Sequence, residues 1–250
     1  LLSLGIPANA AEVLPETSPA PSETPAPSEP PTPEEKPEDE SFTIDLSIVG
    51  DCMLATYKGG YYKGSFNWYA ANKDPSYFLE KVKPVFEADD FTIANLETVL
   101  TDRKLTETPK KGERAFWFKG PASNAKILTS GSVEAVSLAN NHTGDYGEAG
   151  RKDTIAAVEA AGLKYGNNDN TFVVEKNGFK IAVICHGLWS EGQTGEIIPR
   201  IKKWSELSDY QIVFYHGGKE SIHKPEDWKI RASRKLVDAG ADLVIGNHPH

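Results

Sequence analysis

The first 41 residues lack aromatic side chains entirely and contain a single basic residue, Lys36. They hold nine of the acidic residues and ten of the 17 prolines, so they carry −8 of the net charge of −9. The remaining 209 residues are therefore nearly neutral. This distribution excludes both a polyacidic globular domain and a basic nucleic-acid-binding one, so we expect no nucleic-acid partner.

The chain also lacks a long apolar run and has only two cysteines. No window approaches 18 consecutive apolar residues, so no transmembrane segment is expected in this chain. Two cysteines do not make a disulfide framework. Cys52 and Cys185 lie at the ends of apolar runs, which favours two buried thiols over a single bridge between them.

The extreme N-terminus is apolar and begins without Met. Residues 8–10, Ala-Asn-Ala, fit the small-x-small pattern of signal-peptide cleavage. We therefore expect residues 1–11 to be a signal-peptide remnant, with an apolar fragment of a disordered tail as the alternative. Residues 12–41 are rich in Pro and Glu, which predicts a disordered, extended linker. The protein would then be exported, to the cell envelope or beyond it, with its folded domain at 42–250.

From residue 42 onward, the pattern of apolar residues predicts strands that alternate with helices. The expected strands are Phe42–Val49, Phe91–Ala94, Val133–Ala139, Thr171–Glu175, Lys180–Cys185, Gln211–Tyr215 and Asp242–Ile245. The expected helices are Ser76–Ala88, Ala122–Thr129, Glu148–Ala161 closed by Gly162, and Asp227–Ala239 closed by Gly240. Asn177-Gly178 predicts a hairpin, so we expect an α/β domain with a mixed sheet.

Polar or charged residues follow five of these strands, and most of them are Asp, Asn, Glu or His. They are Asp51, Asn95 with Glu97, Asn140-Asn141-His142 with Asp145, His216 with Glu220, and Asn247-His248-Pro249-His250. Because the carboxyl ends of parallel strands meet at one crevice, these side chains are expected to converge there. Asp, Glu, Asn and His are metal-ligand types. His248 and His250 can reach one metal only if the chain bends between them, which Pro249 favours.

The order of these motifs and the residues in them resemble those of a known family. Gly50-Asp51-Cys52-Met53-Leu54, Ala94–Thr98, Ser137–His142, Asp145-Tyr146-Gly147, His216–Glu220 and Gly240–His250 are similar to the bacterial capsule-synthesis family, CapA, also called PgsA in poly-γ-glutamate producers. That family is related to the calcineurin-like metallophosphoesterases. The resemblance implies an α/β fold, a four-layer αββα metallophosphoesterase-like sandwich with mixed sheets. The family continues beyond the last motif, so we expect the domain to be C-terminally incomplete here.

The resemblance also implies roles for individual residues. The implied metal ligands are Asp51, Glu97, Asn141, His216, His248 and His250, the implied catalytic residues are His142 and Asp145, and the implied substrate-binding residues are Asn95, Asn140 and Glu220. One or two divalent ions, with Mn, Mg, Zn, Fe and Ca all open, would activate water and clamp a phosphoryl group. His142 would protonate the leaving oxygen, and Asp145 would orient it.

Four motifs depart from the pattern of the related phosphoesterases or of the family. Met53 replaces a histidine ligand, and Asn95-Leu96-Glu97 stands where the phosphoesterases have Gly-Asp. Gly217 replaces a Trp, and Asn247 replaces a His. The missing histidine at the first metal position allows for a single metal, or for a site that depends on Glu97 and Glu220.

The sequence leaves three hypotheses open. The first is a metal-dependent hydrolase or transferase that acts on a phosphoester or on amide bonds of the capsule polymer. The second is a non-catalytic component that binds or exports an anionic polymer, with membrane synthase subunits as partners. The third is a sugar- or peptide-binding module that retains only the scaffold. The aromatic residues of the segment 57–69 either roof the site or pack a satellite core.

Overall fold

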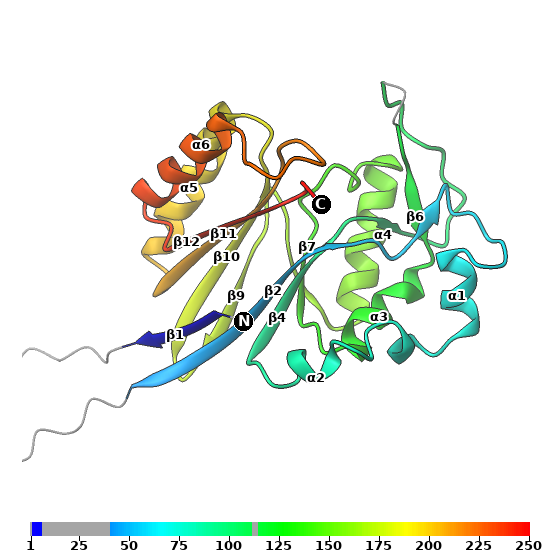
Figure 1. Cartoon of the computed structure of the whole chain (residues 1–250), viewed down its shortest axis with the longest axis horizontal. Coiled ribbons are helices and arrows are strands. Elements are labelled where there is room, and N and C mark those ends of the chain that lie inside the picture. The colour runs from blue at the N-terminus through cyan, green and yellow to red at the C-terminus, as the bar shows by residue number, and fades with distance from the viewer. Residues whose placement is uncertain (1, 7–40, 112–114) are drawn as a thin grey trace, which may run out of the picture. The chain divides into compact units, whose positions relative to one another are not determined.

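The computed structural model describes residues 2–6, 41–111 and 115–250 (Figure 1). Most of the predicted signal-peptide remnant and all but the last residue of the predicted linker lie outside these residues; within the remnant, Leu2–Ile6 form strand β1. The chain divides into two compact units, of which the smaller is Ser3–Ile44 and the larger contains Asp45–His250. The larger unit carries every polar motif of the strand ends.

The first sheet of the larger unit is parallel, with strand order β2-β4-β7-β8. Its strands are β2 (Phe42–Cys52), β4 (Phe91–Leu96), β7 (Ala135–Ser137) and β8 (Lys164–Gly166). Strand β2 continues past the expected stop at Gly50-Asp51. After a register shift that follows Ile48, Asp51 pairs with Asn95 of β4. Such an irregularity re-aims side chains near the strand end, and here it places Asp51 beside Asn95.

The second sheet is mixed, with order β12-β11-β10-β9. Its strands are β9 (Thr171–Lys176), β10 (Phe179–Gly187), β11 (Tyr210–His216) and β12 (Leu243–Asn247). Only the β9–β10 pair is antiparallel. The turn between them has φ of 52° at Asn177 and 81° at Gly178, the two positive values that a tight hairpin turn needs. The predicted hairpin is confirmed.

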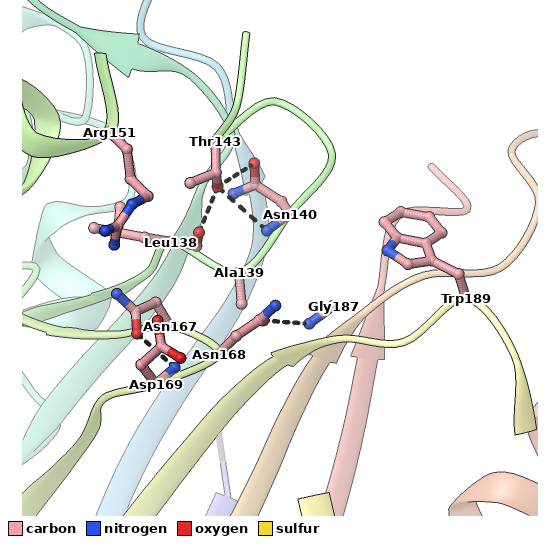
Figure 2. Close-up of a pocket in the computed structure, with 10 residues that line it drawn as sticks. All are labelled: Leu138, Ala139, Asn140, Thr143, Arg151, Asn167, Asn168, Asp169, Gly187 and Trp189. Carbon is pink, nitrogen blue, oxygen red and sulfur yellow. Dashed lines mark hydrogen bonds between the residues drawn. The ribbon is translucent and has the colours of Figure 1, made fainter. Parts of the chain in front are cut away.

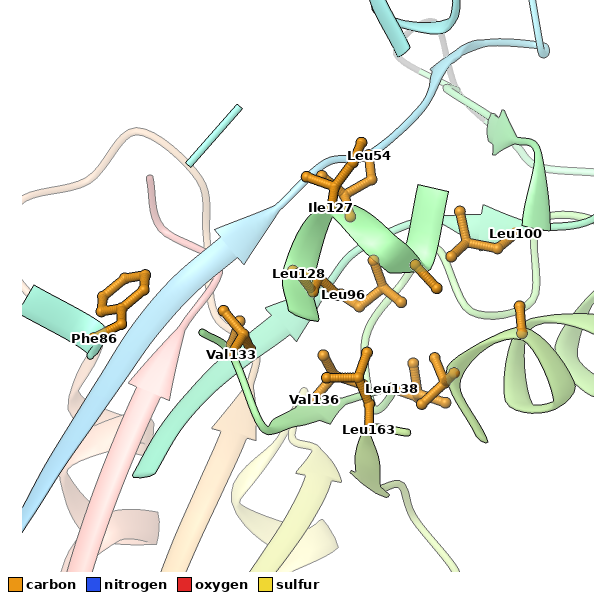
Figure 3. Packing of buried hydrophobic residues seen from close by; sticks show 14 residues of the cluster. Leu54, Phe86, Leu96, Leu100, Ile127, Leu128, Val133, Val136, Leu138 and Leu163 are labelled. Carbon is orange, nitrogen blue, oxygen red and sulfur yellow. The ribbon is translucent and has the colours of Figure 1, made fainter. Parts of the chain in front are cut away.

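Helices cover the outer face of each sheet. Helices α3 (Ala125–Ser130) and α4 (Gly147–Ala160) pack on the first sheet through a cluster that includes Leu96, Leu128 and Val158 (Figure 3). Each fully buried side chain of this size contributes about 1.5–3 kcal/mol.

The second sheet carries its own helical layer. Helices α5 (Thr194–Ser205) and α6 (Asp227–Asp238) pack on it through Ile197, Val213 and Leu236. The inner faces of the two sheets meet, for example where the rings of Phe91 and Phe172 stack with centroids 6.3 Å apart. The result is the four-layer αββα sandwich that the family resemblance implied (Figure 1).

The predicted helix Ser76–Ala88 is wrong. The segment instead forms a 3₁₀ turn at η1 (Pro75–Tyr77) and a single helical turn, α2 (Lys83–Phe86). Pro84 explains the interruption, because a proline in a helix interior removes a backbone donor and its ring collides with the preceding turn. Near the start of α2 the same proline is tolerated.

Other elements escaped prediction or differ from it. The predicted helix over residues 122–129 splits into a 3₁₀ turn and α3. Elements not predicted are β3 (Thr56–Tyr57), α1 (Phe66–Asn72), β5 (Val99–Leu100), β6 (Phe118–Gly120), β8, η3 (Glu191–Gln193) and α5, while the split adds η2 (Ala122–Asn124). Strands β3, β6 and β5 form a small third sheet. Helix α5 was missed because Pro199 lies inside it and interrupts the helical pattern.

The cysteines and the membrane prediction have simple outcomes. Cys52, half-buried, and Cys185, fully buried, are both free thiols, and burial raises the pKa of Cys185 to about 12. Within the described ranges, no helix has the length and apolar character needed to cross a bilayer.

Candidate metal centre

The site forms where the carboxyl ends of the parallel strands of both sheets converge. Asp51 lies near the end of β2, Glu97 directly follows β4, and the loop Asn140–Asp145 follows β7. His216 is the last residue of β11, and His248 directly follows β12. Convergence of strand ends on one crevice is the arrangement expected of an open α/β sheet, here with two sheets contributing.

A buried carboxylate and two buried imidazoles lie at the centre. Glu97, His216 and His248 each expose less than a tenth of their surface. His216 Nε2 lies 3.6 Å from Glu97 Oε1, and the rings of His216 and His248 have centroids 4.6 Å apart. One ligand atom from each of the three residues falls within 4.8 Å of the other two.

The electrostatics of this trio fit a bound cation. Burial, followed by the negative charge of Asp51, raises the pKa of Glu97 to about 8, and Glu97 Oε2 makes no hydrogen bond to any described residue. Burial, followed by the charge of His216, lowers the pKa of His248 to about 4, and His248 Nδ1 has no partner in the described ranges. A divalent ion would stabilise both the ionised carboxylate and the neutral imidazole, which are the forms that ligate metals.

Asn95 holds the first sheet's side of the site together. It is fully buried, and its Nδ2 donates to Asp51 Oδ1 at 2.8 Å while lying 3.1 Å from His216 Nδ1. Its Oδ1 accepts from Asn140 Nδ2 at 3.1 Å. Burial raises the pKa of Asp51, but hydrogen bonds from His216 and Asn95 outweigh it and hold that pKa below its usual value. Because both Nδ2 and Oδ1 of its side chain form hydrogen bonds with other protein atoms, Asn95 positions its neighbours.

His216 is oriented through Nδ1, and its Nε2 is the nitrogen that faces Glu97. Its Nδ1 lies 2.7 Å from Asn247 Oδ1, and its Nε2 lies 2.7 Å from Asn141 Oδ1. Asn247, the residue that departs from the family pattern, thus supplies an orienting contact of the kind that fixes metal-binding imidazoles. The departure at Gly217 has a steric cause, since an added Cβ there would lie 1.7 Å from the carbonyl oxygen of Leu188.

His142 forms a chain of polar contacts that ends at Glu97. Its Nδ1 lies 2.8 Å from Asp145 Oδ2, and its Nε2 faces Glu97 Oε1 at 3.8 Å. Asp145 is fully buried and is held by the backbone N–H of Phe118 at 2.7 Å and by an ion pair with Lys110. The Phe118 ring packs edge-on against the His142 ring, with centroids 4.8 Å apart. The imidazole is therefore fixed with Nε2 toward the carboxylate.

A second group of residues that could hold a metal ion lies at the rim. His248 adopts φ of 99°, a left-handed conformation that is strained for a residue other than glycine and that often marks functional sites. Its Nε2 lies 4.0 Å from Glu220 Oε1, and its ring centroid lies 6.0 Å from that of His250. Ligand atoms of Glu220, His248 and His250 lie within 4.8 Å of one another. His248 therefore belongs to both groups.

The structure brings every site residue named from the sequence into one connected group. The group consists of Asp51, Asn95, Glu97, Asn140, Asn141, His142, Asp145, His216, Glu220, His248 and His250. Among the remaining histidines, His186 is buried in the core and His223 is exposed.

A family model described as "Bacterial capsule synthesis protein PGA_cap" matches residues 45–250. The chain belongs to this family. Among curated proteins, it is 27% identical to the capsule biosynthesis protein CapA of Bacillus anthracis over 83% of this chain and 54% of that protein. It is 26% identical to the PGA biosynthesis protein CapA of Bacillus subtilis strain 168, over 83% and 57% respectively.

The capsule-synthesis chain therefore spans little more than half the length of the curated relatives it matches. Among solved structures, a hypothetical protein from Thermus thermophilus aligns with 83% of this chain and 68% of its own, at a TM-score of 0.50 and 16% identity. At that identity the likeness concerns the fold alone. It agrees with the αββα sandwich of this capsule-synthesis domain.

Two residues at the site of this capsule-synthesis domain were not found from its sequence. Lys110, in the irregular segment after β5, pairs with Asp145, and its Nζ lies 3.5 Å from His142 Nδ1. Trp189, after β10, packs edge-on against His216 and His248, with ring centroids 5.7 and 5.1 Å apart. Neither follows a strand in a motif, so the strand-end argument has no signal for them.

The aromatic residues of segment 57–69 differ in their surroundings. Phe66 packs against Phe78 with ring centroids 5.0 Å apart and adjoins the core under the first sheet. Tyr61 and Tyr62 are exposed. The aromatic rings found against the site histidines come from other segments.

With divalent metal removed, the free energy of unfolding of this domain should fall as pH rises from about 6.5 to 8. The pKa of Glu97 is raised to about 8 in the folded state, so the folded chain keeps a proton on Glu97 at pH values where the unfolded chain has lost it. Rising pH therefore favours unfolding. Below about pH 6.5 His248 opposes this trend. Its pKa is lowered in the folded state, so as pH falls the unfolded chain binds a proton on His248 before the folded chain does. Urea unfolding with chelator should show a loss of roughly 2 kcal/mol between about pH 6.5 and 8. Glu97→Gln should abolish this loss, and the same profile in both chains would contradict the account.

Proposed function

We propose that this chain acts in capsule-polymer synthesis as a metal-dependent hydrolase of phosphoester type. The observation that carries the proposal is the buried carboxylate of Glu97, which has a raised pKa and an unpartnered oxygen and lies between three imidazoles. An isolated buried carboxylate is costly unless a cation or protonation offsets its charge. Membership of the capsule-synthesis family supports the biological setting.

The residues that would hold metal fall into an inner set and a set at the rim. Glu97, His216 and His248 would form the inner set, and Glu220 and His250 would complete a set at the rim through His248. When bound, a divalent ion supplies an activated water and charge stabilisation for a phosphoryl group.

The protein's own part in the reaction centres on His142. Because Asp145 occupies His142 Nδ1, the opposite nitrogen, Nε2, is the one that faces the cluster and can give its proton to a leaving oxygen. Lys110 pairs with Asp145 and so keeps that carboxylate from being an unpaired buried charge. Trp189 and Phe118 pack edge-on against the site histidines and so help to fix their rings.

Turnover of a chromogenic phosphodiester or phosphomonoester tests the proposal. The purified chain should hydrolyse one of these esters in the presence of Mn²⁺ or Zn²⁺, lose the activity in excess chelator, and regain it when metal is restored. Bound metal without any turnover would instead favour a non-catalytic role, in which the metal site holds a carboxylate-rich polymer. The absence of both bound metal and turnover would exclude both roles.

The expected setting is the outside of the cytoplasmic membrane, where the polymer is handled in contact with synthase subunits. The motif at residues 8–10 and the Pro- and Glu-rich linker support this placement. Expression of the gene's full product followed by fractionation tests it, since a protein confined to the cytoplasm would contradict export.

A further inference from the structure

A cavity of about 160 Å³ lies beside the metal centre (Figure 2). Asn140, one of the residues that line it, bonds Asn95, and Trp189, another, packs on His216. This cavity therefore belongs to the site already described. A larger cavity, of about 280 Å³, lies beside the small third sheet.

The larger cavity is separate from the metal centre. None of the residues that line it belongs to the connected group of site residues. On β6, Phe118 packs against His142, whereas the next residue, Lys119, lines the cavity. Because successive side chains of a strand point to opposite faces, the cavity and His142 lie on opposite faces of β6.

This cavity carries positive charge that no neighbour neutralises. Its basic residues are Arg103, Lys104 and Lys119, and Asp102 is the one acidic residue among the described residues that line it. Arg103 is already paired with Asp153, at 3.2 Å. The ammonium groups of Lys104 and Lys119 form no hydrogen bond or ion pair with any other described residue. Two cations thus stay unpaired in a domain that is nearly neutral overall.

Two unpaired ammonium groups match a dianion better than they match a single carboxylate. A phosphate monoester carries roughly −1.5 to −2 charges at pH 7 and offers three acceptor oxygens. Lysine binds phosphate as a point charge, and an arginine guanidinium can add further N–H donors. Arg103 uses one such nitrogen, Nη1, to bind Asp153. The charge of the cavity therefore favours a phosphate group.

The cavity also offers acceptors, which a bare phosphate ion does not use. Asn67 is buried, and its Nδ2 donates to the carbonyl oxygens of Gly60 and Lys119, at 3.3 and 3.1 Å. Its Oδ1 has no partner within the described ranges. Asp102 Oδ1 accepts from the backbone N–H of Ala122 at 3.2 Å, and its second oxygen stays available. An unpartnered buried acceptor is costly, so a ligand that brings hydroxyl donors is favoured.

Tyr61 gives the cavity an aromatic wall. The residue is exposed, and its hydroxyl accepts from Asn72 Nδ2 at 3.4 Å. Small-molecule sites combine such aromatic surface with a few polar groups that fix orientation. At about 280 Å³ the cavity lies just below the range of about 300–1,000 Å³ that is typical of ligand pockets, so it suits one small unit.

We propose that this cavity binds a phosphorylated sugar unit, at a site distinct from the metal centre. Lys104 and Lys119 bind the phosphate, and Asn67 and Asp102 accept from hydroxyl groups. The ring of Tyr61 packs on the carbon face of the sugar. Because the unit is held on the face of β6 opposite His142, this site binds without cleaving. It attaches the domain to a phosphate-bearing glycan or to a free sugar phosphate.

Calorimetric titration of the whole chain with glucose 6-phosphate tests the proposal. Excess chelator is present throughout, so that no metal holds phosphate at the metal centre. Glucose 6-phosphate should bind, and glucose, which lacks the phosphate, should not. Citrate, which supplies negative charge without a sugar ring, should bind at least about 10-fold more weakly than glucose 6-phosphate.

Substitutions assign the parts of the ligand to individual residues. Lys119→Gln and Lys104→Gln should each weaken binding of both glucose 6-phosphate and inorganic phosphate by at least about 10-fold. Tyr61→Ala should weaken binding of glucose 6-phosphate by a few-fold and leave binding of inorganic phosphate unchanged. Lys202→Gln is the matched control, because it removes the same charge from an exposed position on α5, which packs on the second sheet.

The methyl glycoside of glucose 6-phosphate, which is blocked at C1 like a unit within a chain, distinguishes the two sources. Binding equal to that of glucose 6-phosphate supports a glycan-borne unit, and loss of binding supports a free sugar phosphate. The proposal is overturned if the parent chain does not bind glucose 6-phosphate, if Lys119→Gln and Lys202→Gln bind it equally, or if citrate binds as tightly. None of these results depends on ester turnover, which remains the separate test of the hydrolase.

Discussion

His142→Ala should lower kcat for a chromogenic phosphoester by at least about 100-fold, since a positioned general acid typically contributes a factor of about 10² to 10⁴. The variant should still bind metal. His142 Nε2 faces Glu97 at 3.8 Å, but His142 is absent from both groups of residues whose ligand atoms lie within 4.8 Å of one another. Loss of turnover with metal retained is therefore the signature of an acid rather than of a ligand. The measurement pairs steady-state kinetics with metal analysis of the same sample.

A matched control separates this effect from the removal of any histidine. His223→Ala removes an exposed histidine that belongs to neither group of clustered ligand atoms, so its kcat and metal content should equal those of the parent chain. Asp145→Asn should fall between the two, because His142 keeps a hydrogen-bond partner but loses the charge that orients it. If His142→Ala turned over the ester at the parental rate, His142 would have no part in the chemistry.

Glu97→Gln should reduce affinity for divalent metal by at least about 100-fold while leaving the fold intact. The affinity estimate follows because removal of partners that only orient ligands already lowers metal affinity about 10- to 100-fold. The fold should survive because the raised pKa of Glu97, about 8, means that the metal-free site already holds a neutral carboxyl group at neutral pH. Glutamine has nearly the same shape as that neutral group. Thermal unfolding in chelator should thus give equal or higher stability than the parent chain.

Glu220→Gln is the matched control for this substitution. Glu220 is a rim residue whose side chain is about half exposed, and its carboxylate lies 4.0 Å from His248. Its replacement should reduce metal affinity less than Glu97→Gln, because solvent compensates for a lost exposed charge. Competitive titration with a fluorescent chelator measures both variants. Equal affinities in the parent chain and Glu97→Gln would place the metal elsewhere.

Much of the site was predictable because it depends on two local signals. Apolar strand patterns locate strand ends, and the residues just past parallel strands converge by topology. Asp51, Glu97 and His216 were therefore found without knowledge of any contact. The bend at His248 was expected from Pro249, and the structure places a left-handed φ at His248 itself.

What could not be predicted depends on contacts that are distant in sequence. Lys110 and Trp189 come from irregular segments, and only the folded chain brings them to His142 and His248. The shift that follows Ile48 is likewise set by the pairing of β2 with β4, so the predicted strand stopped too early. The close approach of Gly217 to Leu188 gives the departure from the family pattern a steric cause that no single-sequence pattern contains.

An anomalous difference map from crystals of this chain grown with Mn²⁺ tests the proposed metal centre most directly. We expect a peak bounded by Glu97, His216 and His248, at roughly 2.0–2.3 Å from a carboxylate oxygen and from imidazole nitrogens. We further expect the carboxylate of Glu97 to be ionised and turned toward the ion. A map with no peak among these three residues, in crystals where the metal is present in excess, would contradict the central claim.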